Sequence, residues 1–194
     1  MGERTSHAPG TFSWAEPATG DAAAHGVAVV ARFLEEAGVV HEILEHAPTY
    51  STLEEAEAVH EDPRHSAKTL ALHDRGGWRI AVLPAGHRLD LERARRLLGG
   101  TRHLRLGTEE EIAVAFPAFD VGALPPLGPM LPAPEVVDVR LLYRDHVVCA
   151  GGDHRHAVRL DPRDLIRLAE PRVGDICEHD RLPHRKGFAD LPRA

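Results

Sequence analysis

A proline- and glycine-rich stretch, residues 117–134, constrains the fold of this 194-residue chain more than any other segment. It holds six prolines and two glycines in 18 residues. Because proline lacks a backbone N–H and has a fixed φ, this stretch cannot form a helix or a central strand. A long loop inside a compact domain is more often functional than idle when it is ordered. The stretch therefore predicts a functional loop between two structured halves, and a plain surface connection is the alternative.

Regular elements are predicted on both sides of this loop from hydrophobic periodicity, capping residues and turn residues. Helices are expected over residues 22–37, 51–60, 90–98, 108–115 and 161–169. Strands are expected over residues 39–44, 67–73, 78–83, 136–139, 147–150 and 157–160. Hairpins recur and crossover helices are few, which favours an α+β single domain with a mixed, largely antiparallel sheet and surrounding helices. We expect a disordered segment over residues 1–20, the domain over 21–170, and a loose tail over 171–194.

Composition and charge argue against several classes of function and partner. The net charge of −7 argues against a large nucleic-acid footprint, since duplex binding needs many Lys and Arg contacts to phosphate. A local positive patch remains possible where arginines are dense, at Arg93, Arg95, Arg96, Arg102 and Arg105. No apolar run approaches the roughly 20 residues of a membrane-spanning helix, and two cysteines make no disulfide framework. We therefore expect a cytoplasmic protein with reduced thiols and no membrane partner.

Lys68 is an unusual residue for its position. Lysine and arginine together number 23, but only two of these residues are lysines. Lys68 interrupts an apolar segment, residues 66–72, that otherwise reads as a buried strand. An ammonium is compact and mobile, whereas the guanidinium of arginine is a planar fork, so the two are not interchangeable. The retained lysine indicates a need for a compact positive charge, although a strand lysine is more often an edge residue with its head in water.

Several short segments, in their order and spacing, resemble one known family. In chain order they are Glu54-Glu55-Ala56, Ala67-Lys68-Thr69-Leu70, Val82-Leu83-Pro84-Ala85, Arg88-Leu89-Asp90-Leu91, Thr108-Glu109-Glu110-Glu111, Gly122 to Pro126 with Gly128, Asp138, and Ala150-Gly151-Gly152 with Val158-Arg159-Leu160. No single piece is decisive, since a Gly-x-x-x-Pro pattern alone is weak. Together, over roughly residues 25–170, they resemble the YbaK / prolyl-tRNA-synthetase-associated editing domain family of aminoacyl-tRNA deacylases.

The resemblance implies a trans-editing hydrolase that cleaves the ester between a wrong amino acid and the 3′ end of a tRNA. The substrate implied is a small amino acid such as Ala or Cys, possibly on tRNA-Pro, with an aminoacyl-tRNA synthetase as a further possible partner. No cofactor is implied. The residues implied in catalysis are Lys68, which would hold the terminal phosphate, and Gly122 and Pro126, whose loop would place N–H groups near the ester carbonyl. The residues implied in substrate binding are Asp138, His154 (with His156 as a rival), Ala123, Gly151 and Thr69.

Other readings of the same residues stay open. Asp138 can equally be a satisfied structural carboxylate. The 14 histidines suggest metal binding around residues 153–156 and 177–184, but their spacing is unlike that of a zinc site, and no metal is expected. A family-like module that has lost hydrolysis and binds aminoacyl-tRNA, a nucleotide or a protein is the alternative function. A metal-dependent hydrolase is a third and weaker alternative for the function.

Overall fold

The computed structural model describes residues 24–179, which form a single domain of five α-helices around one eight-stranded sheet. The helices are α1 (Val27–Glu36), α2 (Thr52–Ala58), α3 (Leu91–Leu98), α4 (Glu109–Ala115) and α5 (Pro162–Ala169). The strands are β1 (His41–Glu45), β2 (Ser66–Asp74), β3 (Gly77–Pro84), β4 (Arg105–Leu106), β5 (Glu135–Asp138), β6 (Val147–Asp153), β7 (His156–Leu160) and β8 (Arg172–Gly174). Two 3-10 turns, Gly128–Met130 and Val139–Tyr143, flank β5.

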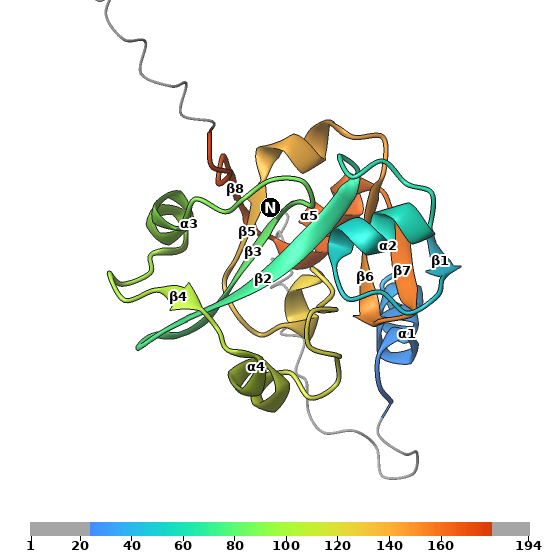
Figure 1. The fold of residues 1–194 in the computed structure, drawn as a ribbon, viewed down its shortest axis with the longest axis horizontal. Helices are drawn as coiled ribbons and strands as arrows, with labels where there is room; N and C mark the ends of the chain where they lie inside the picture. Colours follow the sequence, from blue (N-terminus) through green and yellow to red (C-terminus); the bar gives the residue numbers. More distant parts are fainter. Residues whose placement is uncertain (1–23, 180–194) are drawn as a thin grey trace, which may run out of the picture.

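The sheet is mixed, as the sequence predicts. Its strand order is β1-β7-β6-β2-β3-β5-β8, with β4 added beside β2. The long pairings are antiparallel hairpins, β2 with β3 and β6 with β7. The parallel pairings are β2 with β6, β3 with β5 and β5 with β8. In Figure 1, α1 and α2 lie beside β6 and β7, whereas α3 lies on the other side of β2.

Two hydrophobic clusters form the core, one on each face of β2. Because side chains alternate along a strand, Ala67 and Ala71 enter the larger cluster, whereas Leu70 and Leu72 face the smaller one under α3. The larger cluster takes in residues of α1 and α5 and much of the proline-rich loop, including Leu124, Leu127 and Leu131. That loop is therefore ordered by its own apolar side chains, which supports the expectation that it is more than a connection.

Helix ends follow the sequence closely where a capping side chain is present. Ser51, Asp90, Thr108 and Asp161 each accept a backbone N–H at the start of α2, α3, α4 and α5. The start of α1 differs from the prediction, because the helix begins at Val27 and not at Ala22. Gly26 precedes it with φ 58°, a left-handed value that ends any continuous helix at this point.

The C-terminal part of the domain extends further than the sequence indicates. We expected a loose tail from Pro171, but β8 pairs with β5, and Ile176 and Cys177 are fully buried. The expected tail is therefore wrong for residues 171–179, while residues 180–194 and the expected disordered segment 1–20 lie outside the described residues. Across residues 24–179 no helix combines the length and apolar character needed to cross a membrane.

Candidate functional site

Lys68 lies in β2, and its side chain is half-buried. Its ammonium donates to the carbonyls of Ala85, at 3.1 Å, and His87, both in the loop after β3. Burial lowers the pKa of Lys68 below its usual value, and the nearby Arg88 adds to that effect. An ammonium has three donors, and two of them are used by these carbonyls. The loop after β3 thus holds the Lys68 head in place and leaves one N–H for a ligand.

A small pocket forms where the proline-rich loop meets the turn before α2. It is lined by Thr49, Tyr50, Ser51, Thr52, Glu55, Gly122, Ala123, Asp153 and His154. The structure thus brings together three residues named from the sequence: Gly122, Ala123 and His154. The pocket is partly open to solvent, and its innermost space is about 10 Å³, which is roughly what one water molecule needs.

Gly122 gives the loop its shape at the pocket. Its φ of +91° favours glycine, although a Cβ there would meet only His154 Cε1, at 3.8 Å. The requirement is therefore one of backbone conformation and not of space. The Ala123 N–H is already donated to the Asp120 carbonyl, at 3.0 Å. Within residues 24–179 the Gly122 N–H has no backbone acceptor, so it is a donor that the loop can offer to a ligand in the pocket.

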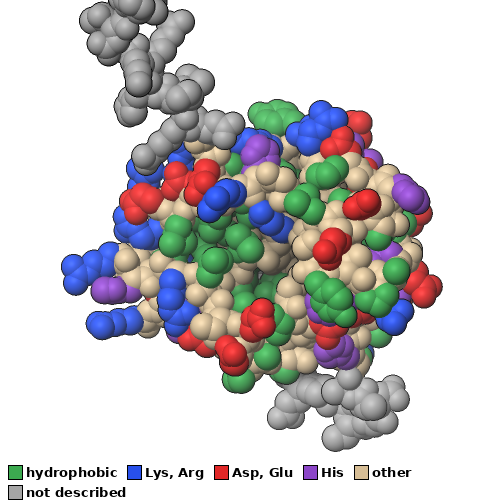
Figure 2. All heavy atoms as spheres, in the orientation of Figure 1, with side chains coloured by type: hydrophobic (Ala, Val, Ile, Leu, Met, Phe, Trp, Pro, Cys, Tyr) green, Lys and Arg blue, Asp and Glu red, His purple; other side chains and the backbone are tan. Residues whose placement is uncertain are grey.

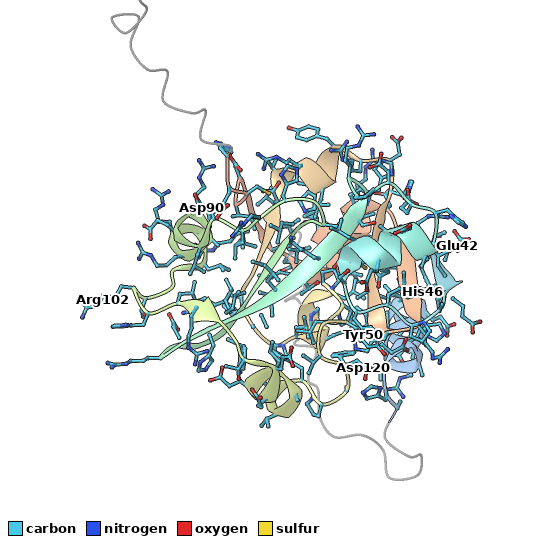
Figure 3. All side chains as sticks on the ribbon, viewed as in Figure 1. Glu42, His46, Tyr50, Asp90, Arg102 and Asp120 are labelled. Atoms are coloured by element: carbon cyan, nitrogen blue, oxygen red, sulfur yellow. The ribbon has the colours of Figure 1, made fainter. Side chains whose placement is uncertain are left out.

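His154 and Tyr50 stand side by side at the pocket. Their ring centroids are 4.9 Å apart, and 76% of Tyr50 is exposed. The backbone of His154 is tied down, since its carbonyl accepts the Thr49 N–H at 3.0 Å. The rival residue, His156, instead contacts Asp153 through its ring, at 2.8 Å. Figure 3 shows Tyr50, His46 and Asp120 on the same side of the molecule, near α1 and α2.

Glu55 is the residue of this pocket to which the sequence analysis gave no role. It lies in the first turn of α2 and is buried, and burial raises its pKa to about 7. One of its carboxylate oxygens has no hydrogen-bond partner among the described residues, and the other lies 4.0 Å from His46 Nε2. A carboxyl group that titrates near neutral pH in a pocket is typical of acid–base sites. The segment Glu54-Glu55-Ala56 was part of the family resemblance, but only the tertiary packing shows which glutamate is buried.

The raised pKa of Glu55 makes stability depend on pH. Because the folded state holds the proton more tightly than the unfolded state, stability is lost as pH rises from about 4.5 to about 7. We expect Glu55→Gln to remove this loss and to be more stable than the wild type at pH 8 by up to about 3 kcal/mol. Urea unfolding at pH 5 and pH 8 measures this.

Glu135 must be controlled in that experiment, because burial also raises its pKa to about 7. Glu135 lies in β5, outside the pocket. A Glu135→Gln variant should show a similar gain at pH 8. If Glu55→Gln keeps the full wild-type pH dependence while Glu135→Gln removes it, the assignment to Glu55 is wrong.

The other residues named from the sequence do not line the pocket. Asp138 is fully buried at the end of β5 and accepts hydrogen bonds from Arg140 and from the Ile176 N–H. Thr69 faces away from Lys68, with its hydroxyl buried and without a partner among the described residues. Pro126 is buried in the loop, and Gly151 packs so closely on His156 that a Cβ would lie 2.7 Å from its carbonyl oxygen. The structure places these four residues outside the pocket, and their roles in the site stay predictions.

Cys177 lies near both Lys68 and Asp138. The thiol of Cys177 is close enough to Lys68 to influence its pKa, and it hydrogen-bonds to Asp138. Burial raises the pKa of Cys177 to about 12, so this thiol is neutral at physiological pH. The candidate residues therefore lie in two regions: the pocket at Gly122, Glu55 and His154, and the Lys68 ammonium near Cys177.

The expected arginine patch is largely neutralised. Arg93 pairs with Asp175 at 2.6 Å, and the guanidinium groups of Arg95 and Arg105 pair with Glu92 and Glu111. Figure 2 shows blue and red side chains mixed along the edge formed by α3 and β4, beside hydrophobic side chains and a hollow near the centre of the face. This arrangement suits a small number of phosphate contacts and not a long duplex.

Comparison with known proteins assigns the family. The sequence profile described as the aminoacyl-tRNA editing domain matches residues 46–168, more than half of the chain. The chain belongs to the aminoacyl-tRNA editing domain family. The match includes Lys68 and the pocket residues, and it confirms the family resemblance found in the sequence. A comparison with curated protein sequences found no match.

Solved structures agree with this editing-domain assignment. One, proposed as a trans-editing enzyme for prolyl-tRNA synthetase, is 32% identical, with a TM-score of 0.71 over 79% of this chain and 97% of its own. A scaffold used for computational epitope grafting is 30% identical, with a TM-score of 0.70 over 79% of this chain and 97% of its own. The hypothetical protein APE2540 is 27% identical, with a TM-score of 0.69 over 77% of this chain and 99% of its own.

Proposed function

We propose that this editing-domain protein is a trans-editing hydrolase that removes a small amino acid, such as alanine or cysteine, from a mischarged tRNA. The observation that carries the proposal is the convergence of the Gly122 loop, Glu55 and His154 on a water-sized pocket. The match of a structure proposed as a trans-editing enzyme for prolyl-tRNA synthetase supports tRNA-Pro as the tRNA. Such a protein would act in the cytoplasm, with the aminoacylated 3′ end as its partner and a synthetase as a possible second one.

The reaction needs a positioned water and donors for an oxyanion. The water oxygen attacks the ester carbonyl carbon, the bond from that carbon to the ribose oxygen breaks, and the ribose oxygen takes up a proton. The N–H group of Gly122 is suited to stabilise the negative charge on the carbonyl oxygen. Glu55, with its pKa near 7, is suited to accept a proton from the water. An aminoacyl ester is already activated, so positioning supplies much of the catalysis.

Lys68 would anchor the tRNA end. Its two hydrogen bonds to the carbonyls of Ala85 and His87 fix the ammonium, and its third donor can bind a phosphate oxygen. Because the ammonium is a point charge, it can hold a phosphate without the two-pronged geometry of arginine. In this proposal Lys68 sets where the ester lies relative to the pocket.

Tyr50 offers a stacking surface at the mouth of the pocket. Aromatic rings bind the face of any base, and stacking contributes about 1–3 kcal/mol per base. We expect Tyr50→Ala to raise KM for the mischarged tRNA by about 5- to 150-fold and to change kcat little, because Tyr50 would bind the terminal base and not the ester. Steady-state kinetics measures this, with Tyr143→Ala as a control, since Tyr143 is also exposed but does not line the pocket. An equal effect of both variants would contradict a stacking role.

The function itself is tested with a panel of mischarged tRNAs. Alanyl-, cysteinyl- and seryl-esters on several tRNA bodies, including tRNA-Pro, are incubated with the purified protein, and ester loss is measured. Hydrolysis of one or two members supports the proposal and names the substrate. If the protein binds these tRNAs but cleaves none, the binding module is the correct function instead.

A further inference from the structure

Three potential metal ligands meet outside the pocket and outside the Lys68 region. They are Glu61, which follows α2, His65, which directly precedes β2, and His146, which directly precedes β6. His65 and His146 are 81 residues apart in the chain, so the spacing of the histidines in the sequence does not indicate that they meet. All three side chains are partly buried, and one donor atom from each lies within 4.8 Å of the others.

The distances between these atoms match the edges of a metal coordination shell. His65 Nδ1 lies 3.2 Å from His146 Nε2 and 3.3 Å from a Glu61 oxygen. His146 Nε2 lies 3.0 Å from the other Glu61 oxygen. A tetrahedral ion with bonds of about 2.0–2.1 Å places neighbouring ligand atoms about 3.3–3.4 Å apart. Each contact is within a few tenths of an ångström of such an edge, and the two histidines contact different oxygens of the Glu61 carboxylate.

A neighbouring side chain holds the Glu61 carboxylate in place, as outer hydrogen bonds do in metal sites. Arg159 donates to a Glu61 oxygen at 3.1 Å, and ligating carboxylates in metal sites are commonly held by such outer hydrogen bonds. Arg159 also binds Glu42, at 2.5 Å, so its charge is shared between two carboxylates.

The segments that carry the ligands are also joined by the backbone. The Val148 N–H donates to the His65 carbonyl at 2.9 Å, next to the point where β2 and β6 pair in parallel. The two histidines therefore lie next to paired strand ends, and Glu61 lies in the segment that joins α2 to β2, which keeps the ligands together without a metal.

We propose that Glu61, His65 and His146 form a binding site for one divalent transition-metal ion of the zinc type. Two imidazoles and one carboxylate are a donor set that suits zinc and its neighbours, and the partial exposure of the cluster leaves a fourth position for water. Bound metal links the beginnings of β2 and β6 and thereby stabilises the folded state. The proposal departs from the sequence analysis, which expected no metal site, and it does not rest on the proposed hydrolase function.

The test is a titration of the untagged, full-length protein with Zn²⁺, and separately with Co²⁺ as a coloured probe. We expect one ion per chain, a visible cobalt spectrum of the intense tetrahedral kind, and a melting temperature that rises with Zn²⁺ and falls back with a chelator. Loss of an outer hydrogen-bond partner weakens metal sites by about 10- to 100-fold, so His146→Ala, which removes a ligand, should weaken binding by about 100-fold or more.

Two further variants make the result specific. Glu61→Gln keeps the shape of the side chain but removes its charge, and it should also abolish the tetrahedral cobalt spectrum. His103→Ala removes an exposed histidine near β4 and should bind metal as the wild type does. The proposal is overturned if no stoichiometric ion binds. It is also overturned if His146→Ala and Glu61→Gln bind metal as tightly as the wild type, because the metal then lies elsewhere.

Discussion

Lys68→Ala is expected to lower kcat/KM for deacylation by about 100-fold or more while the protein stays folded. Loss of a group that positions the substrate can misplace the reacting ester, and a misplacement of about 1 Å can cost about 10²-fold in rate. Lys68 is half-buried and donates to two backbone carbonyls, so its ammonium is positioned before substrate arrives. Single-turnover hydrolysis of a mischarged tRNA, with the melting temperature measured on the same sample, checks this prediction.

Two conservative variants separate the charge of Lys68 from its stem. Lys68→Met keeps an unbranched apolar stem on the sheet, so it should fold as the wild type does but lose the same activity as Lys68→Ala. Lys68→Arg keeps the charge but changes its shape, and we expect it to recover only part of the activity. Wild-type turnover by Lys68→Met would show that the ammonium has no part in the reaction.

Asp138→Ala is expected to lower the free energy of unfolding by about 3–5 kcal/mol, because it removes charge-assisted hydrogen bonds from Arg140, worth about 1.5–3 kcal/mol, and leaves the buried Ile176 N–H without its acceptor, at about 1–3 kcal/mol. The Asp138 side chain has no exposed surface and contacts Arg140 through both oxygens, at 3.0 Å each. It also accepts the N–H of Ile176, at 2.9 Å, and so ties the end of β5 to the segment after β8. Burial alone would raise the pKa of Asp138, but these hydrogen bonds outweigh it, so the carboxylate is charged at neutral pH.

Urea unfolding at pH 7 measures this effect. Asp145→Ala is the control, because Asp145 is an exposed carboxylate a few residues away, and such surface changes usually stay within about 0.5 kcal/mol. The result also decides between the two roles considered for Asp138. Unchanged stability together with a raised KM would support substrate binding, and a large loss of stability supports the structural role.

The sequence predicted the elements that local chemistry defines. Asp90 and Gly99 bound α3, with Asp90 accepting two backbone N–H groups and Gly99 in the left-handed conformation. The turn between β2 and β3 was equally clear, because four polar and glycine residues separate two apolar strands. In contrast, β8 is only three residues long and has exposed side chains, so nothing local indicates it. Its existence depends on pairing with β5, which is a tertiary contact.

The candidate site also combines residues that the sequence indicated with residues that only tertiary packing brings together. The resemblance placed Gly122, Ala123 and His154 in one site, and the structure gathers these residues around one pocket. Glu55 could not be selected over Glu54 from sequence, because only the packing of α2 on β2 and β6 decides which glutamate is buried. The Glu61, His65 and His146 cluster was equally invisible, since the two histidines meet only through the parallel pairing of β2 with β6.

The central claim is tested most directly by the half-life of the ester bond in alanyl-tRNA-Pro at neutral pH. It is measured in buffer, with the wild-type protein and with Lys68→Met at the same concentration. The wild type should shorten the half-life, and Lys68→Met should leave it near the value in buffer. A half-life that the wild-type protein does not change, for this ester and for the cysteinyl and seryl esters, would contradict the hydrolase.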